Sequence, residues 1–249
     1  MNTKQNEIKY VDRLDPREKK WLYTKPFGHY SYRESFLRLR DFSYIIELLS
    51  LKEDKVTTLL DLGCGTGWTS IMLAKLDLAV TAVDISDNMI AIARENAKKE
   101  KSLFKGKVEF NVCDIEKINF KNQFDRVLIY DGLHHCPNEQ KVLRNAYRAL
   151  RPGGVMLVVE PNIGHQYDPE AQKVAKRFGV LEKGYSPVYL KKSLKKIGFK
   201  NIIRYHCNYG INKPVSGGIG SFVKQVARLV VTRLILSHYS SQVWIQAQK

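Results

Sequence analysis

Two adjacent histidines, His134 and His135, follow an apolar stretch, residues 126–130, that is typical of a buried strand. An imidazole titrates near neutral pH, so it suits a group that accepts a proton from a reacting nucleophile. Tyr130 ends the same stretch, and Glu160 ends the next one. We take His135 and Tyr130 as catalytic candidates, and His134 and Glu160 as substrate contacts. Packing, or capping of the following helix, explains either histidine equally well.

The histidines are followed directly by Cys136, so three types of metal-binding residue stand in a row. Three adjacent side chains do not easily converge on one ion. From the sequence we therefore expect no metal site.

A glycine-rich run, LLDLGCGTGW, occupies residues 59–68. It joins a strand-like stretch to a segment with a helical pattern, residues 69–76. Glycine permits a sharp turn and a close approach of a ligand, and the helix start offers free N–H groups. The run therefore predicts a nucleotide-type pocket after the first strand. A dinucleotide motif would place its third glycine where Trp68 stands, so the spacing disfavours an NAD-linked dehydrogenase.

Acids follow the next two strand-like stretches. Residues 80–83 lead to Asp84, and residues 108–112 lead to Cys113 and Asp114. A carboxylate at the tip of a second strand can accept both hydrogen bonds of a ribose diol. The position of Asp84 therefore indicates a nucleoside ligand.

The order and spacing of these features over about residues 40–206 resemble the class I, Rossmann-like S-adenosylmethionine-dependent methyltransferases of the small-molecule and lipid type. Besides the glycine run, LHH at 133–135 and LRPGG at 150–154 are familiar in that family. The resemblance implies S-adenosylmethionine as cofactor and S-adenosylhomocysteine as product. The cofactor contacts it implies are Asp61, Gly63, Cys64, Gly65, Gly67, Asp84, Ile85, Asp114, Ile115 and Tyr130. It also suggests Tyr30 and Tyr32 as a lid at the substrate, with ordinary packing as the alternative.

Strand and helix patterns alternate along the chain, which predicts an α/β fold. We expect a Rossmann-like, doubly wound sheet of seven strands, mostly parallel, with helices on both faces. The last strand, residues 243–247, should be antiparallel. We expect residues 1–50 to form an N-terminal arm and lid helix, and residues 51–249 a methyltransferase domain with a basic helical insertion at about 211–241.

Charge is unevenly distributed. The formal net charge is +16, and residues 161–249 hold 15 basic and 3 acidic side chains. Residues 222–236 have the pattern of a basic amphipathic helix. We expect residues 220–236 either to contact an anionic membrane surface or to pack on the domain core, which is the commonest fate of an apolar stripe.

These observations favour methyl transfer to a small-molecule, sugar or lipid-linked acceptor, with oxygen as the expected atom. An RNA methyltransferase using the basic C-terminal region, and a non-catalytic protein that binds S-adenosylmethionine, remain alternatives. The four cysteines form no C-x-x-C pair, and the N-terminus is polar. We therefore expect a cytoplasmic protein, with a peripheral position on the inner face of the membrane left open.

Overall fold

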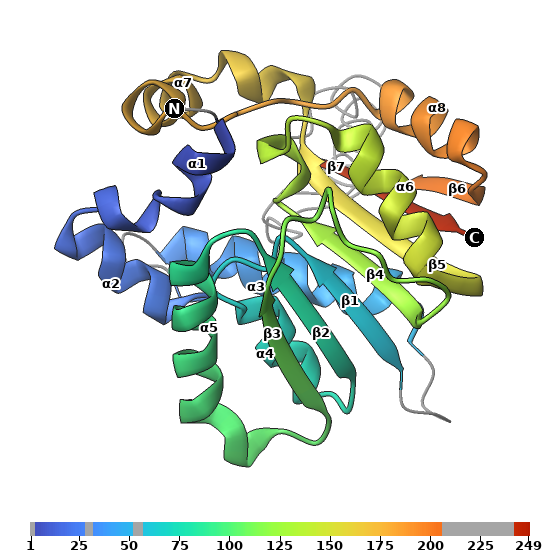
Figure 1. Ribbon diagram of the computed structural model, residues 1–249, viewed down its shortest axis with the longest axis horizontal. Coiled ribbons are helices and arrows are strands. Elements are labelled where there is room, and N and C mark those ends of the chain that lie inside the picture. The colour runs from blue at the N-terminus through green and yellow to red at the C-terminus, as the bar shows by residue number, and fades with distance from the viewer. Residues whose placement is uncertain (1–2, 28–31, 52–56, 206–241) are drawn as a thin grey trace, which may run out of the picture.

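The computed structural model describes residues 3–27, 32–51, 57–205 and 242–249. Strands and helices alternate through the central part of the chain (Figure 1). The strands are β1 Thr58–Leu62, β2 Ala79–Asp84, β3 Lys107–Val112, β4 Phe124–Tyr130, β5 Leu150–Pro161, β6 Lys200–Tyr205 and β7 Gln242–Gln248. The α-helices are α1 Thr3–Ile8, α2 Pro16–Thr24, α3 Tyr32–Leu48, α4 Trp68–Ala74, α5 Asp87–Glu100, α6 Glu139–Ala149, α7 Pro169–Phe178 and α8 Pro187–Ile197. Short 3-10 turns are η1 Val11–Arg13, η2 Lys101–Leu103, η3 Leu133–His135 and η4 Ile163–Tyr167.

The seven strands form one sheet in the order β3-β2-β1-β4-β5-β7-β6. β1 pairs in parallel with β2 and β4, whereas β7 is antiparallel to both β5 and β6. The chain reverses its direction of winding between β1 and β4. In open α/β sheets, ligands bind at the carboxyl ends of the strands at this reversal. The predicted Rossmann-like sheet with an antiparallel last strand is confirmed.

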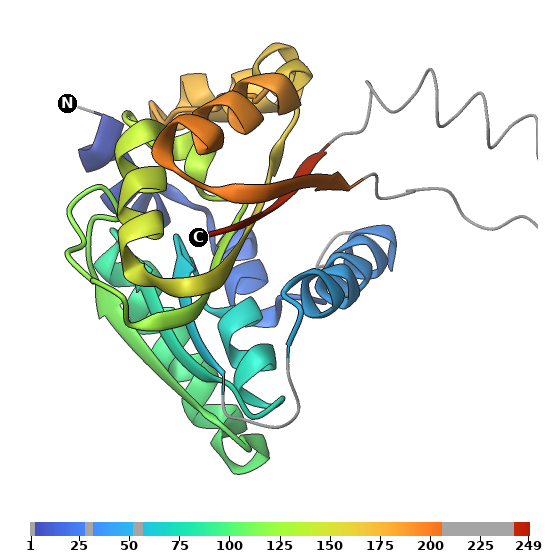
Figure 2. The ribbon, with the colours of Figure 1, turned by 90° about the vertical axis from the view of Figure 1, so that its right-hand side faces the viewer.

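Helices cover both faces of the sheet because its central strands are apolar on both sides. Along β1, Leu60 and Leu62 pack into the cluster that contains α6 and α8. Leu59, which precedes Leu60 and so faces the other side of the strand, packs into the cluster of α3, α4 and α5. This alternation is the period of two that a strand imposes. Figure 2 shows α6 and α8 on one side of the sheet and α3 on the other.

Capping residues set where several helices begin. The Ser86 hydroxyl accepts the Met89 N–H at the start of α5. α6 begins at Glu139, two residues after Pro137, because the Asn138 side chain caps it by accepting the Lys141 N–H. α8 begins at Pro187. The boundaries therefore follow local side-chain chemistry.

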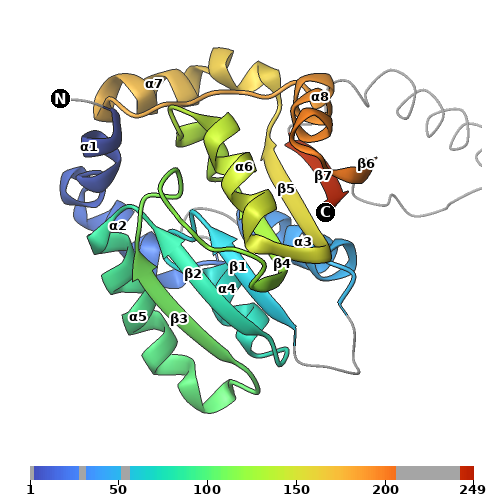
Figure 3. The same cartoon turned by 45° about the vertical axis from the view of Figure 1, so that its right-hand side comes forward.

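The N-terminal segment lies against the sheet's carboxyl edge. α1 and α7 lie above the ends of the strands in Figures 1 and 3. Within α3, Phe42 and Ile45 share a core cluster with Leu59 of β1, so α3 belongs to the same packed unit as the sheet. The predicted division at residue 50 stays a prediction. The predicted helical insertion at 211–241 and the segment 220–236 lie outside the described residues. Among the helices that are described, none combines the length and apolarity that a membrane span requires.

Candidate active site

The glycine run forms the turn between β1 and α4. The N–H groups of Gly63 and Cys64 both donate to the Val83 carbonyl at the end of β2. Gly67 has a φ of +72°, and a Cβ there would lie 2.5 Å from Cε1 of Phe110. Only glycine fits both the backbone conformation and the space at this position. The turn is thus held tightly against the second strand.

Asp84 holds the glycine turn from the tip of β2. Its Oδ2 accepts the Gly65 N–H at 2.8 Å, and its Oδ1 accepts the Ser86 N–H at 2.9 Å. Burial raises the pKa of this carboxyl, although the two N–H donors act against that effect. Asp84 therefore stands at the carboxyl end of β2, between the glycine turn and α5, where a ribose would meet it.

Asp61 is a buried carboxylate that stabilises the start of α4. It is 1% exposed, and its Oδ2 accepts hydrogen bonds from the hydroxyls of Thr69 at 3.0 Å and Ser70 at 2.5 Å. Burial raises its pKa to about 6, and the two hydroxyls partly offset this. The carboxylate thus fixes the first turn of the helix that follows the glycines, and Thr69 and Ser70 join the set of residues that shape the loop.

The remaining predicted cofactor residues surround the same edge. Asp114 forms an ion pair with Lys4 of α1, with Oδ2 and Nζ 2.8 Å apart. Ile115 is buried in the core cluster beneath, whereas Ile85 is half-buried. Cys64 is buried, and burial raises its thiol pKa well above the usual value. These residues adjoin the pocket edge, and their contact with a cofactor stays a prediction.

Tyr130 does not have the environment of a general base. Its hydroxyl donates to Asp41 Oδ2 at 3.0 Å, and its ring meets the edge of Trp68 with centroids 5.8 Å apart. Burial, together with the charge of Asp41, raises the pKa of the phenol well above its usual value. The phenol therefore stays protonated, and Trp68 packs between Tyr130 and Phe42 of α3.

Glu160 differs from its predicted role as a substrate contact. It is 0% exposed, and its two oxygens accept the N–H groups of Gly132, Leu133 and His134. Its Oε2 also lies 2.8 Å from Nδ1 of His134. A carboxylate with four partners and no exposed surface holds the loop after β4; it is not placed to touch a substrate.

His135 differs from the expected neutral base. Burial would lower its pKa, but the carboxylate of Glu7, whose Oε1 lies 3.3 Å from Nδ1, together with the charges of Glu182 and Asp131, raises it to about 10. The free imidazole therefore carries a proton at neutral pH. His135 lies in η3, directly after the carboxyl end of β4, but in this state it has no free lone pair with which to accept a proton.

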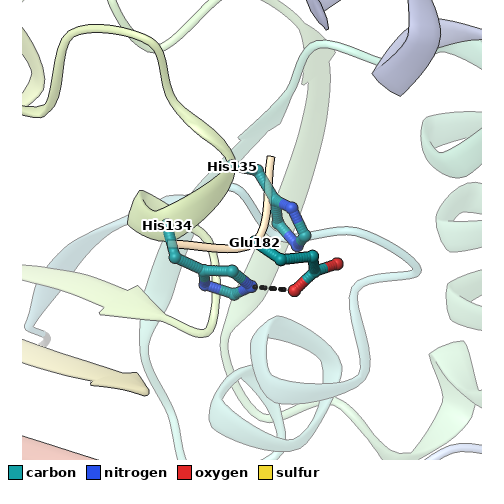
Figure 4. Close-up of side chains that lie close together, drawn as sticks. All are labelled: His134, His135 and Glu182. Atoms are coloured by element: carbon teal, nitrogen blue, oxygen red, sulfur yellow. Dashed lines mark ion pairs between the residues drawn. The ribbon is translucent and has the colours of Figure 1, made fainter. Parts of the chain in front are cut away.

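Of the three adjacent residues His134, His135 and Cys136, the two histidines approach each other and the cysteine turns away. Because η3 is a tight turn, the rings of His134 and His135 lie with centroids 3.8 Å apart. Glu182 and His165 approach them from the segment after β5, while the Cys136 thiol turns to the Gly132 carbonyl. Figure 4 shows the His134, His135 and Glu182 side chains gathered at one point.

Tyr32 is 97% exposed, so in this structure it does not close over the pocket as predicted. Tyr30 lies outside the described residues. The side chains that do reach the pocket edge from the N-terminal segment are Lys4 and Glu7 of α1, which the sequence analysis missed. Glu182 and His165 were missed as well, because no motif marks them and the contacts arise only on folding.

Comparison with known proteins agrees with this geometry. Residues 60–158 match the family described as "Methyltransferase domain". This central region is a class I S-adenosylmethionine-dependent methyltransferase domain. The match extends from the middle of β1 into β5, so it contains the glycine turn, Asp84 and the histidine pair. The family resemblance inferred from the sequence is confirmed for this domain.

Relatives of the methyltransferase domain act on different acceptors by name. A demethylmenaquinone methyltransferase of Leptospira interrogans is 43% identical over 102 residues, which cover 39% of this chain and 40% of that protein. Phosphoethanolamine N-methyltransferase 2 of Caenorhabditis elegans is 32% identical over 156 residues, covering 58% of this chain and 33% of that one. The chain thus spans well under half the length of these two relatives.

Solved structures share the fold. Haemonchus contortus phosphoethanolamine N-methyltransferase 2 in complex with S-adenosylmethionine has a TM-score of 0.67 at 21% identity, covering 97% of this chain and 59% of that one. The [4+2]-cyclase SpnF has a TM-score of 0.59 at 19% identity, covering 84% of this chain and 80% of that one. At such identities the likeness concerns the architecture alone.

Proposed function

We propose that the protein transfers a methyl group from S-adenosylmethionine to a small-molecule, sugar or lipid-linked acceptor, at oxygen. The observation that carries this proposal is Asp84 at the carboxyl end of β2, which accepts the Gly65 N–H of the turn that follows β1. A carboxylate there both shapes the glycine turn and offers oxygens to a ribose diol. The domain match over residues 60–158 supports the same cofactor.

The chemistry asks little of the protein beyond position. The acceptor atom, the methyl carbon and the sulfonium sulfur must fall in line, and holding them so is worth several kcal/mol of barrier. The glycine turn and Asp84 supply one wall of the site. The opposite wall is the loop after β4, which Glu160 fixes through the N–H groups of residues 132–134. The acceptor would meet the methyl group between these two loops.

The relatives support a small acceptor without naming it. Demethylmenaquinone and phosphoethanolamine, from the names of the relatives, are chemically unlike each other. The SpnF comparison adds that this fold also serves a cyclase. Binding and turnover therefore need separate tests.

Calorimetry with S-adenosylmethionine and S-adenosylhomocysteine tests binding. Asp84→Ala should weaken affinity by about 2 kcal/mol, roughly thirtyfold, because hydrogen bonds to a charged group are lost. Asp84→Asn, which keeps the shape of the side chain, should weaken affinity by a smaller amount. Asp87→Ala, an exposed acid in the next turn, is the matched control and should bind as wild type. Wild-type affinity in Asp84→Ala would reject the proposed cofactor site.

A screen of acceptors with isotopically labelled methyl donor tests turnover. The expected result is label in a hydroxyl-bearing small molecule or lipid extract, lost in Asp84→Ala. Label in RNA would favour the RNA methyltransferase alternative. Tight binding of the cofactor with no labelled product from any acceptor would favour the non-catalytic alternative.

A further inference from the structure

Four side chains with metal-binding atoms meet beside the proposed acceptor position. His134 and His135 come from η3, His165 from η4, and Glu182 from the segment between α7 and α8. One ligand atom each from His134, His135 and Glu182 lies within 4.8 Å of the others. Figure 4 shows these three side chains directed toward one another, although Glu182 is far from the two histidines in the sequence.

The hydrogen bonds of His134 fix which of its nitrogens is free. Nδ1 lies 2.8 Å from Oε2 of Glu160, whose oxygens also accept three backbone N–H groups. A carboxylate in that position accepts, so Nδ1 carries the hydrogen. In the neutral ring the lone pair is then on Nε2, which faces Glu182 with Nε2 and Oε2 3.7 Å apart. A buried carboxylate behind an imidazole is the usual arrangement behind a metal-bound histidine.

His135 repeats the pattern with a different partner. Its Nδ1 lies 2.8 Å from the Leu181 carbonyl oxygen, which can only accept. Nδ1 therefore carries a hydrogen in this ring as well, and deprotonation leaves Nε2 as the ligand atom. The carboxylates of Glu7 and Glu182 beside this ring attract a divalent cation.

Glu182 also has an outer partner. Its Oε2 lies 2.8 Å from Nε2 of His165, which orients the carboxylate. Two hydrogen bonds to the backbone of η3 hold this segment in place. The Lys183 N–H donates to the His134 carbonyl, and the Tyr185 hydroxyl donates to the Leu133 carbonyl. Each of the three ligand side chains thus has a second interaction that sets its direction, as metal sites require.

We propose that His134 Nε2, His135 Nε2 and Glu182 bind a divalent transition-metal ion, with Zn²⁺ the best match to two imidazoles and a carboxylate. Two ligand atoms on a tetrahedral zinc ion lie about 3.4 Å apart at zinc–ligand distances near 2.1 Å. The 3.7 Å between His134 Nε2 and Glu182 Oε2 is close to that value. Small rotations of the side chains would bring in the third ligand. Three protein ligands leave a position open, as in catalytic sites.

Local charge supports a cation here. The chain carries +16 overall, yet Glu7, Glu160 and Glu182 surround the two histidines. Glu7 Oε1 is buried and accepts no hydrogen bond among the described residues, although it lies 3.3 Å from His135 Nδ1. Lys183, the nearest lysine in sequence, turns its Nζ to the Cys136 carbonyl and to Glu139. Glu182 therefore has no ion pair with its neighbour Lys183.

The inference rests on the proposed function and narrows its acceptor to one with a hydroxyl. An acceptor oxygen at the open position would lose its proton to solvent, because a bound metal lowers a hydroxyl pKa. An oxygen lone pair then forms the bond to the methyl carbon, while the carbon–sulfur bond breaks and its electron pair stays on sulfur. His134 and His135 are ligands in this scheme, so neither has to accept the proton.

Metal binding is tested on untagged, metal-stripped protein by calorimetry with Zn²⁺ and by visible absorption with Co²⁺. We expect one ion per chain and an intense tetrahedral Co²⁺ spectrum. His134→Asn keeps a donor for Glu160 but lacks Nε2, and Glu182→Gln lacks the charge; each should weaken binding at least a hundredfold. Glu170→Gln, the same change on an exposed residue of α7, is the matched control and should bind as wild type.

Cofactor binding, measured on the same samples, separates this inference from the proposed function. Unchanged S-adenosylmethionine affinity in His134→Asn and Glu182→Gln, with metal binding lost, supports the site. Absence of stoichiometric metal binding in wild type, or wild-type metal affinity in both variants, would overturn the metal site and leave the cofactor proposal standing. Metal binding without S-adenosylmethionine binding would support the ion and reject the proposed methyl transfer.

Discussion

Gly65 and Gly67 both have positive φ, +53° and +72°, but their surroundings differ. A Cβ on Gly65 would meet nothing within 4 Å, whereas one on Gly67 would lie 2.5 Å from Phe110. Gly65→Ala should therefore cost only the backbone term, about 1 kcal/mol. Gly67→Ala should add an overpacking cost of about 1–3 kcal/mol. Urea unfolding of the two variants measures this difference.

Gly65→Ala, the less destabilised of the two variants, should nevertheless lose affinity for the cofactor. The open space at Gly65 is where a cofactor would approach the backbone, so a methyl group there obstructs it. Gly65→Ala should stay folded and lose affinity for S-adenosylmethionine at least tenfold. If it binds the cofactor as tightly as wild type, the glycine turn is not the cofactor cradle.

Asp61 should make stability depend on pH in a way opposite to most acids. Burial raises its folded-state pKa to about 6 from 3.8, so between these values the native state binds more protons than the unfolded state. Its ionised form costs stability above pH 6, and that cost disappears as the pH falls below 4. Asp61→Asn should therefore gain about 2 kcal/mol more, relative to wild type, at pH 7.5 than at pH 4.5.

Chemical denaturation at the two pH values measures the Asp61 effect without ligand. Asp87→Asn, an exposed acid at the start of α5, is the control and should show no such difference. An equal stability change in Asp61→Asn at both pH values would show that the carboxyl titrates normally in the folded protein.

At the scale of elements, α1 is a short helix that depends on side-chain contacts to stay at the pocket edge. Lys4 Nζ pairs with Asp114 Oδ2 at 2.8 Å and Glu116 Oε2 at 2.7 Å. The Ile8 carbonyl accepts the Ser86 hydroxyl. Lys4→Gln should release the helix locally because partly exposed pairs contribute about 1 kcal/mol. Hydrogen exchange should rise about fivefold in residues 3–8 with unchanged global stability.

Lys173→Gln is the matched control for Lys4, since Lys173 pairs with Glu170 on the surface of α7. It should leave exchange in α1 unchanged. Salt at 0.5 M should reduce the difference in hydrogen-exchange rate between Lys4→Gln and wild type, because it screens the ion pairs of Lys4. Equal exchange in Lys4→Gln and wild type at low salt would show that other contacts hold α1.

The elements differ in how far the sequence predicts them. The sheet and the glycine turn follow from local signals: short apolar stretches, such as the one that contains Leu59 and Leu60, and glycines at fixed spacing. The acceptor side depends on contacts across long separations. His135 meets Leu181, 46 residues away, and Glu182 has no motif around it. The sequence predicts a substrate contact at Glu160 because it shows an acid at the end of a strand. It does not show the four N–H partners that surround this carboxylate in the folded protein.

At the scale of the whole molecule, acids and bases are separated. Glu7, Glu160 and Glu182 gather at the pocket, whereas α8 exposes four lysines, Lys191, Lys192, Lys195 and Lys196. Residues 161–249 hold 15 basic and 3 acidic side chains in all. A one-sided basic field attracts anionic partners over about a Debye length. If the acceptor is lipid-linked, this field would bring the pocket to the membrane that holds it.

Flotation with vesicles tests that prediction. Vesicles with 30% phosphatidylglycerol should recover the protein, and neutral phosphatidylcholine vesicles should not. Each lysine near an anionic surface contributes about 1 kcal/mol, so Lys195→Glu with Lys196→Glu should lower the partition coefficient at least tenfold. The double change Lys98→Glu and Lys99→Glu on α5 is the control, because it alters net charge equally on another helix.

Equal losses of vesicle binding in both double variants would mean that net charge alone drives binding. Equal recovery on both vesicle types would reject an anionic-lipid partner. A different result would support the RNA methyltransferase alternative: the protein binds transfer RNA more tightly than either vesicle type, the binding weakens with salt, and the α8 double variant loses it.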